Sequence, residues 1–320
     1  MSEFIENVRK IMRTKRYSIK TEKSYLNWIV RYIRFHNLKH PEKLGGREVS
    51  EFLTYLANTR KVSASTQNQA LCALAFLYKT VLDQELVDLK FGYSKQPKRL
   101  PSVISAIEVQ KIVNQTQGVY QLIAGILYGS GLRINEALSL RIKDIDFDNK
   151  TIFVFRGKGQ KDRVTILPNT LIKPLEEQIK KVKKIHKRDI NQGFGQTSVP
   201  PSLFKKYGNA LVDAKWQYLF PSTTRCVHPH DGYICRHHLH ASAFAKQLRK
   251  AVIAADVDKK VSAHTFRHSF ATEMLRAGAD IRTLQELMGH SDIRTTEIYT
   301  HVIGEKFARD TSPLDRLSTE

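Results

Sequence analysis

The sequence predicts a mainly helical protein of two domains, with a small β component confined to the second. Its 320 residues are enough for two domains of ordinary size. Apolar residues recur at helical spacing through residues 1–91. Further along, two short alternating segments are typical of a β-hairpin. We therefore expect a helical N-terminal domain followed by an α+β domain.

The helical pattern of residues 1–91 is clearest in three stretches. In residues 21–36, aromatic and aliphatic side chains follow the i, i+3, i+4, i+7 spacing of one helix face. Residues 49–56 and 71–82 repeat that pattern, and Ser65 and Thr66 are candidate N-caps before the third stretch. Aromatic residues at this spacing are typical of a packed core, so we assign them to the core.

A break in composition separates the two domains. Gly92 to Pro101 contains two prolines and basic residues without periodicity, which predicts a linker over 92–102. Ser105 and Glu108 form a capping-box pattern that opens the second domain, residues 103–304. In it the pattern predicts strands over 151–155 and 163–167, and helices over 119–128, 134–140, 171–190, from about 241, 265–276, 281–288 and 293–302.

Charge indicates the class of partner. The chain has 52 Lys and Arg against 31 Asp and Glu, a formal net charge of +21. Residues 1–100 carry +10 and the remainder +11, so both domains are basic. A polyanion contacted by both domains fits this distribution, and duplex DNA or RNA is the natural choice. The alternative is a basic protein that is merely kept in solution by its charge.

Other classes fit less well. No apolar run is long enough to span a bilayer, and the polar N-terminus does not resemble a signal peptide. Three cysteines form no disulfide framework. We expect a cytoplasmic protein.

Several residues of the second domain have side chains suited to phosphate chemistry. In chain order they are Arg133, Lys158, His264, Arg267, His290 and Tyr299. His264 and Arg267 are three residues apart, so they share a helix face. Each residue alone is more often structural, and Arg133 could simply pair with Glu136 three positions on. Their ordered combination is what indicates a function.

That combination resembles the tyrosine recombinase, or phage integrase, family. The matching stretches are Gly131 to Leu138, Gly157 to Arg163, His264 to Thr272, Leu287 to Ser291 and Tyr299 to His301. Their spacing is like that of Xer recombinases, and the first domain looks like the family's core-binding domain. The resemblance implies a clamp around DNA, with the six residues above as the catalytic set and Tyr299 as the nucleophile.

Elementary chemistry agrees with these roles. Attack on a phosphodiester concentrates negative charge on its non-bridging oxygens, and the guanidiniums of Arg133 and Arg267 can each donate paired hydrogen bonds to them. A tyrosine hydroxyl has a pKa near 10, so it needs activation. Lys158, at a hairpin tip, is the expected general acid for the leaving 5′-oxygen. Glu136 is expected to orient this shell. The product is a 3′-phosphotyrosyl ester, and no metal or other cofactor is expected.

Residues 191–240 are longer than a minimal catalytic domain of this family requires. Trp216 to Ser222, followed by Arg236 to His240, look like the insertion of integron integrases. That resemblance implies capture or excision of gene cassettes at folded single-stranded sites with flipped-out bases. We expect base contacts from Trp216, Tyr218, His237, His238 and His240.

Two other interpretations of this segment remain open. Its cysteines and histidines suggest zinc, but Cys226, His228 and Cys235 do not follow the usual ligand spacing. The segment could also be a surface insertion without function.

Three alternatives for the whole protein also remain. They are a Xer- or phage-type integrase acting on duplex sites, a type IB topoisomerase-like enzyme that nicks and reseals, and a catalytically silent DNA-binding protein. For the recombinase we expect self-association on DNA, as a tetrameric synapse in the bacterial nucleoid. Residues 305–320 would then form a tail that docks on a neighbouring protomer.

Overall fold

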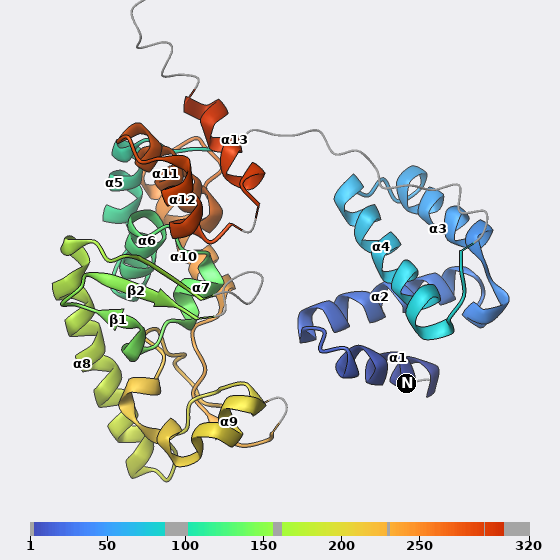
Figure 1. The fold of residues 1–320 in the computed structure, drawn as a ribbon, viewed down its shortest axis with the longest axis horizontal. Coiled ribbons are helices and arrows are strands. Elements are labelled where there is room, and N and C mark those ends of the chain that lie inside the picture. Colours follow the sequence, from blue (N-terminus) through green and yellow to red (C-terminus); the bar gives the residue numbers. More distant parts are fainter. Residues whose placement is uncertain (1–2, 87–101, 156–161, 229–230, 291, 304–320) are drawn as a thin grey trace, which may run out of the picture. The chain divides into compact units, whose positions relative to one another are not determined.

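A computed structural model describes residues 3–86, 102–155, 162–228, 231–290 and 292–303 (Figure 1). The chain divides into two units, Met1–Arg99 and Leu100–Glu320, each with its own hydrophobic core. The division falls inside 92–102, and all of that stretch except residue 102 lies outside the described residues.

The described part of the first unit is helical, as the sequence predicts. Its elements are α1 (Glu3–Thr14), α2 (Ile19–Phe35), the 3₁₀ turn η1 (Pro41–Lys43), α3 (Gly46–Asn58), α4 (Ala64–Phe76) and the π-helical η2 (Leu77–Leu82). Ser63 caps α4 by accepting the Thr66 N–H, so the cap lies before the candidates Ser65 and Thr66. The helical face predicted over 71–82 is thus shared between α4 and a π-helical end.

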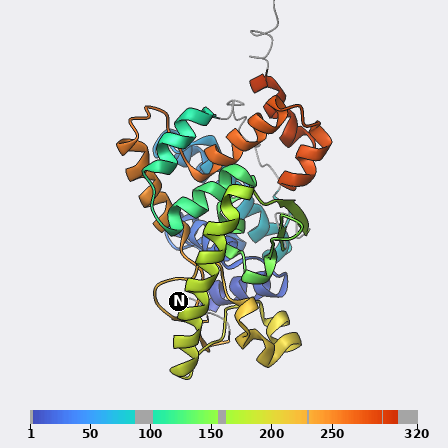
Figure 2. The same cartoon turned by 90° about the vertical axis from the view of Figure 1, so that its left-hand side faces the viewer.

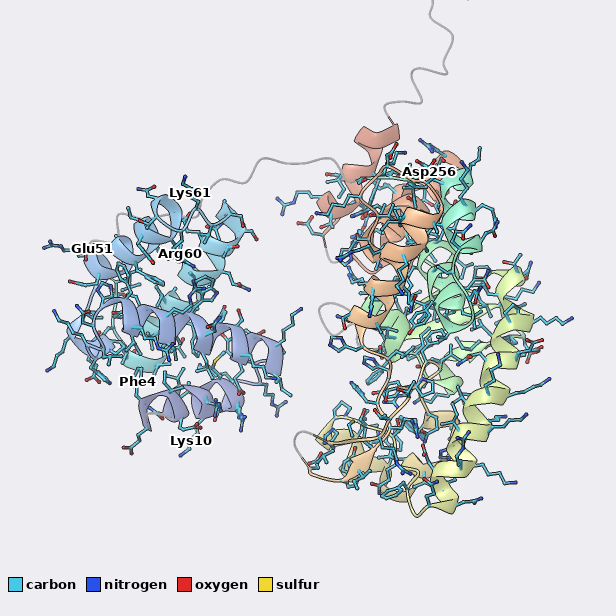
Figure 3. The ribbon with its side chains drawn as sticks, turned by 180° about the vertical axis from the view of Figure 1, so that it is seen from behind. Phe4, Lys10, Glu51, Arg60, Lys61 and Asp256 are labelled. Carbon is cyan, nitrogen blue, oxygen red and sulfur yellow. The ribbon has the colours of Figure 1, made fainter. Side chains whose placement is uncertain are left out.

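The core of this unit is aromatic. Tyr32 of α2 and Tyr78 of η2 are fully buried, and their hydroxyls lie 2.8 Å apart in a hydrogen bond. Tyr78 also donates to the carbonyl of Pro41 at 3.1 Å. Charged side chains such as Lys10 of α1, Glu51 of α3 and Lys61 of the loop after α3 project outward (Figure 3).

The second unit is mixed, as the sequence predicts, with helices around a small sheet. The helices before the sheet are α5 (Ala106–Asn114), α6 (Val119–Gly129), α7 (Ile134–Ser139) and η3 (Ile142–Asp144). The predicted capping box is confirmed, because Ser105 and Glu108 exchange hydrogen bonds at 2.7 and 3.2 Å. The antiparallel sheet has the order β1 (Ile145–Asp146), β2 (Thr151–Val154) and β3 (Arg163–Ile166), and α8 (Asn169–Asn191) follows it.

The segment 191–240 folds around a small core of its own. It contains α9 (Pro201–Tyr207), η4 (Gly208–Val212), η5 (Ala214–Trp216) and the hairpin β4 (Cys226–Val227) and β5 (Ile234–Cys235). Asp189, near the end of α8, forms ion pairs with Arg225 and Arg236 at 3.4 and 2.6 Å. These pairs hold the segment against the end of α8, where α9 lies in Figure 2.

The chain then returns to the main core and ends in a helical group. Its helices are α10 (Ala241–Ala254), α11 (Ala263–Arg276), α12 (Ile281–Met288) and α13 (Arg294–Ile303). Phe270, Leu284, Met288 and Tyr299 form the buried cluster that joins the last three helices. Within the described residues, no helix is both long and apolar enough to cross a membrane.

Candidate active site

Arg133 is held at the start of α7 by the carboxylate of Glu136. Glu136 accepts the backbone N–H of Arg133 at 2.9 Å and its Nη1 at 2.8 Å. The turn before it requires Gly131, which has φ +64° and lies so close to Phe270 that a Cβ would be 2.4 Å from the ring. The glycine therefore lets α11 pack directly under Arg133.

Arg163 is a third cation of this network, and the sequence analysis gave it no role. From the start of β3 its Nη1 and Nη2 donate to the two oxygens of Glu136 at 3.1 and 2.7 Å. Its Nε donates to the carbonyl of Leu287 at 2.9 Å, which ties the sheet to α12. Gly289 has φ +62°, and a Cβ there would be 2.8 Å from Arg163 Cδ.

Glu136 remains ionised although it is buried. Burial alone would raise the pKa of its carboxyl, but the hydrogen bonds and charges of Arg163 and Arg133 lower it to about 2. Arg267 Nη1 is also 3.8 Å from this carboxylate. One carboxylate thus orients three guanidiniums.

Arg267 is the most buried of the three. It is 4% exposed, and it donates to the carbonyls of Gly131 and Met288 at 2.5 and 2.6 Å. Burial and the nearby charge of Arg133 lower the pKa of Arg267 to about 9, so it stays protonated at neutral pH. Three of its five N–H donors serve described neighbours, including His290.

His290 follows the left-handed turn at Gly289 that ends α12. Its Nε2 lies 2.9 Å from Arg267 Nη2, and its Nδ1 lies 2.9 Å from Thr296 Oγ1. An arginine can only donate, so His290 Nε2 is the acceptor in that pair and the ring proton is assigned to Nδ1.

Tyr299 lies inside the helical group and not at the surface. It is 1% exposed, and its ring is stacked with that of His290 at a centroid distance of 6.4 Å. Its hydroxyl lies 2.7 Å from Nδ1 of His268, a residue without a predicted role. Burial raises the pKa of Tyr299, and the charges of Arg267 and Arg133 oppose that rise.

Two predicted catalytic residues remain, His264 and Lys158. His264 is exposed on α11, and partial desolvation of its ring together with the charges of Arg267 and Arg133 lowers its pKa. Its ring is 6.4 Å from that of His268. Lys158 lies outside the described residues. The structure therefore brings Arg133, Arg267, His290 and Tyr299 into one region, with His264 beside it.

Trp216 and Tyr218 are buried within the insertion. Trp216 packs with Val199 and Leu211, and Lys143 Nζ lies 3.5 Å from its ring centroid. The Tyr218 hydroxyl donates to the carbonyl of Ser198 at 3.0 Å. Most of the surface of these two side chains is therefore used in packing within the protein, and only a small part of each is accessible.

The three histidines are more accessible. His237 and His240 are exposed and His238 is half-buried. The rings of His237 and His238 are 4.0 Å apart. Although the residue as a whole is exposed, partial desolvation of its ring and the charge of His238 lower the pKa of His237 to about 4, so its ring is neutral at pH 7. His240 caps α10 by accepting the Ser242 N–H at 3.2 Å.

A cavity of about 280 Å³ lies between the sheet and the insertion. Its aromatic lining comes from Phe153, Phe155, Tyr207, Trp216 and Tyr218. Arg141, Lys143 and Glu136 add polar groups to the wall, so the cavity reaches the carboxylate of the arginine network. Its volume is close to the lower end of the ~300–1,000 Å³ typical of small-ligand pockets.

No group of three or more His, Cys, Asp or Glu side chains is placed to hold a metal ion in the described part of the chain. Cys226 and Cys235 of the insertion instead face each other across the β4–β5 hairpin.

Family models cover most of the chain. Residues 101–305 match the phage integrase family, and residues 4–88 match its N-terminal SAM-like domain. The chain belongs to the phage integrase family. It is a tyrosine site-specific recombinase, an enzyme that cuts and rejoins DNA by transesterification.

Several relatives of this recombinase are similar over most of their length. An "Integrase/recombinase" of Escherichia coli is 43% identical over 314 residues, which cover 98% of this chain and 93% of that protein. A tyrosine recombinase XerD of Agrobacterium fabrum is 31% identical over 277 residues, covering 81% of this chain and 76% of the relative.

Solved structures agree on the fold. XerH recombinase bound to a palindromic difH substrate superposes with a TM-score of 0.62 at 21% identity, covering 97% of this chain and 84% of that one. A lambda integrase dimer bound to a core site gives a TM-score of 0.60 at 16% identity, covering 93% and 94%. The predicted fold class, mainly helical with small sheets, is confirmed.

Sequence reasoning missed Arg163, His268 and Thr296 as members of the site. His268 is four residues after His264, so the helical spacing that paired His264 with Arg267 was also a signal for His268. Arg163 bonds Glu136 from 27 positions away and Thr296 bonds His290 from six positions away, and no local pattern marks either residue.

Proposed function

We propose that Tyr299 is the nucleophile and that Arg133, Arg267, His264 and His290 bind the phosphate under attack. The observation that carries this proposal is the burial of the Tyr299 hydroxyl beside the guanidinium network. The tyrosine oxygen forms a bond to phosphorus, the bond from phosphorus to the 5′-oxygen breaks, and Lys158 donates the proton that the leaving oxygen takes. Rejoining reverses these steps, so the reaction needs no external energy.

Tyr299→Phe tests this assignment. The variant lacks only the hydroxyl, so it should bind DNA with near-normal affinity and form no covalent adduct on a denaturing gel. A covalent adduct formed by Tyr299→Phe would remove Tyr299 from this role.

We further propose DNA as the partner and self-association on it. Both units of the chain are basic, XerH was solved bound to its difH substrate, and lambda integrase was solved as a dimer on a core site. A tetrameric synapse of this chain, with residues 305–320 docked in trans, extends that proposal. These tail residues lie outside the described part of the structure.

Within site-specific recombination, we propose that the enzyme captures or excises gene cassettes at folded single-stranded sites, as an integron integrase does. The aromatic cavity supports this proposal, because an extruded base could enter it between Tyr207, Trp216 and Phe155. Because Trp216 and Tyr218 are mostly buried, they would contact a base from the cavity wall. His237 and His238 would contact it from the accessible surface.

The two separate strands and the duplex of a candidate cassette site distinguish the possibilities. Base stacking is worth ~1–3 kcal/mol per base, so His237→Ala with His238→Ala should weaken binding to a folded strand by about tenfold per lost base. Binding to the paired duplex should change far less. His240 was also expected to contact bases, but because its Nδ1 caps α10 we propose that it serves the helix and not a base, which makes His240→Ala the matched control. Equal losses on both substrates would contradict base recognition and leave the recombinase assignment intact.

A Xer-type enzyme acting on duplex sites is the second candidate. Relatives named XerD and XerC support it. For such an enzyme the duplex would be the better substrate, and neither separated strand would be cleaved efficiently.

A further inference from the structure

The proton of the nucleophile has one evident destination. Among the described residues, the hydrogen-bond partner of Tyr299 Oη is His268 Nδ1, at 2.7 Å. A buried phenol is a hydrogen-bond donor that must be satisfied, and a neutral imidazole nitrogen is a good acceptor. We therefore assign the hydrogen to Tyr299 and the accepting lone pair to His268 Nδ1.

His268 is neutral when the site is empty. Burial, together with the charges of His264 and Arg267 on the same helix, lowers the pKa of its ring to about 4. The imidazole can therefore accept a hydrogen bond throughout the neutral pH range. Because burial raises the pKa of Tyr299, the proton stays on the phenol at rest.

Resting on the proposed role of Tyr299, we propose that His268 is the general base of strand cleavage, taking the phenolic proton as the tyrosine attacks phosphorus. The Tyr299 O–H bond breaks as the bond from oxygen to phosphorus forms, and the proton moves to His268 Nδ1. The leaving 5′-oxygen receives a different proton, from Lys158. During rejoining His268 returns its proton to the tyrosine oxygen, so the cycle is balanced.

Two other candidate bases near the tyrosine, His290 and Glu136, are already engaged, and a third, His264, is exposed with its ring 6.4 Å from that of His268. His290 Nε2 accepts from Arg267 and its Nδ1 bonds Thr296, so its contact with Tyr299 is ring stacking. Both oxygens of Glu136 accept hydrogen bonds from Arg163 and Arg133. His268 is the one that contacts the reacting oxygen.

Substrate binding would activate this base. The positive charge of Arg267 disfavours protonation of the His268 ring, and Arg267 and Arg133 act in the same way on the ring of His264. A phosphodiester bound to those guanidiniums brings a negative charge that offsets part of this effect. His268 therefore gains basicity when DNA is in place, at the moment when the proton must leave.

A more acidic nucleophile provides the test. The substrate is a nicked duplex oligonucleotide, selected from a randomised pool for covalent trapping by the wild-type protein. General-base catalysis is typically worth ~10²–10⁴ in rate, so His268→Ala should slow single-turnover cleavage at pH 7 by about 100-fold or more. Replacing Tyr299 by 3,5-difluorotyrosine, whose phenol ionises more readily, should recover at least about tenfold of that loss in the His268→Ala protein. In the wild-type background the same replacement should change the rate by less than about threefold.

Two further comparisons separate this role from a structural one. His268→Asn offers an amide oxygen near the position of Nδ1 and should preserve folding and tyrosine placement, yet it cannot take the proton. It should therefore be slow and also rescued by difluorotyrosine. A substrate with sulfur in place of the 5′-bridging oxygen, whose thiolate leaves without protonation, should rescue Lys158→Ala but neither His268 variant.

Cleavage by His268→Ala or His268→Asn within about threefold of wild type would overturn the proposal. So would slow cleavage by His268→Asn that difluorotyrosine does not accelerate. An adduct formed by Tyr299→Phe would instead refute the nucleophile assignment, so the two failures are distinguishable.

Discussion

Replacing Glu136 with glutamine tests the arginine network most directly. The pKa of Glu136 falls from 4.5 to about 2 in the folded protein. Each pKa unit corresponds to about 1.4 kcal/mol, so the ionised carboxylate contributes roughly 3 kcal/mol of stability at neutral pH. Because its side chain is 9% exposed, solvent screens little of this energy. Glu136→Gln should lose about that amount, since it leaves the two buried guanidiniums of Arg163 and Arg267 and the partly buried one of Arg133 without their counter-charge.

The stability that ionised Glu136 contributes should fall as the pH is lowered. The folded-state pKa is the lower one, so this stability is fully present above about pH 5 and is lost as the pH falls toward 2. By pH 3 about 2 kcal/mol of the difference between wild type and Glu136→Gln should have disappeared.

Urea unfolding followed by tryptophan fluorescence measures this energy. The chain has two tryptophans, Trp28 in the first unit and Trp216 in the second, so Trp28→Phe leaves a reporter of the second unit alone. Glu273→Gln is the matched control, because its ion pair with Arg276 is about one-third exposed and should be worth less than about 1 kcal/mol. The reasoning fails if Glu136→Gln is as stable as wild type at pH 7, or if its deficit is unchanged at pH 3.

Three more predictions concern the reaction. Arg133→Ala and Arg267→Ala should each slow strand cleavage by ~10²–10³ while weakening DNA binding much less, measured by adduct formation and by gel shift; cleavage within a few-fold of wild type would contradict their roles. Cleavage should persist in excess EDTA, because the proposed mechanism uses only protein side chains; loss of adduct that zinc or magnesium restores would count against it. Truncation after Gly304 should preserve single-site binding and reduce synapsis and recombination, and unchanged recombination would refute docking of residues 305–320 in trans.

Local patterns predicted the elements well and their long-range partners poorly. The α2 helix, the β2–β3 hairpin and the capping box of α5 follow from apolar periodicity and from neighbouring residues. Helix α1 was not singled out, although Ile5, Val8 and Met12 form its buried face. Because most residues of α1 are polar, the helical spacing of these three apolar residues was not recognised in the sequence.

In the active site, too, the local pair was predicted and the long-range contacts were not. The Arg133–Glu136 pair is local in sequence, and the sequence predicted Glu136 as an orienting residue. The bond from Arg163 to Glu136 joins residues 27 positions apart, and that from His268 to Tyr299 joins residues 31 apart. The burial of Trp216 depends on Val199, Leu211 and a cation from η3. Such contacts exist only after the helices and the sheet have packed.

The charge balance of the site favours the transition state over the bound substrate. Arg133, Arg163 and Arg267 surround one carboxylate, Glu136, so the described network keeps two net positive charges. A phosphodiester carries one negative charge, and a second develops on its oxygens when a tyrosine that has given up its proton attacks. The site is therefore better matched to the doubly charged transition state, which is the condition for a faster chemical step. In the proposed mechanism, moving the phenolic proton to His268 creates that second charge where the arginines can stabilise it, so the base and the guanidiniums depend on each other.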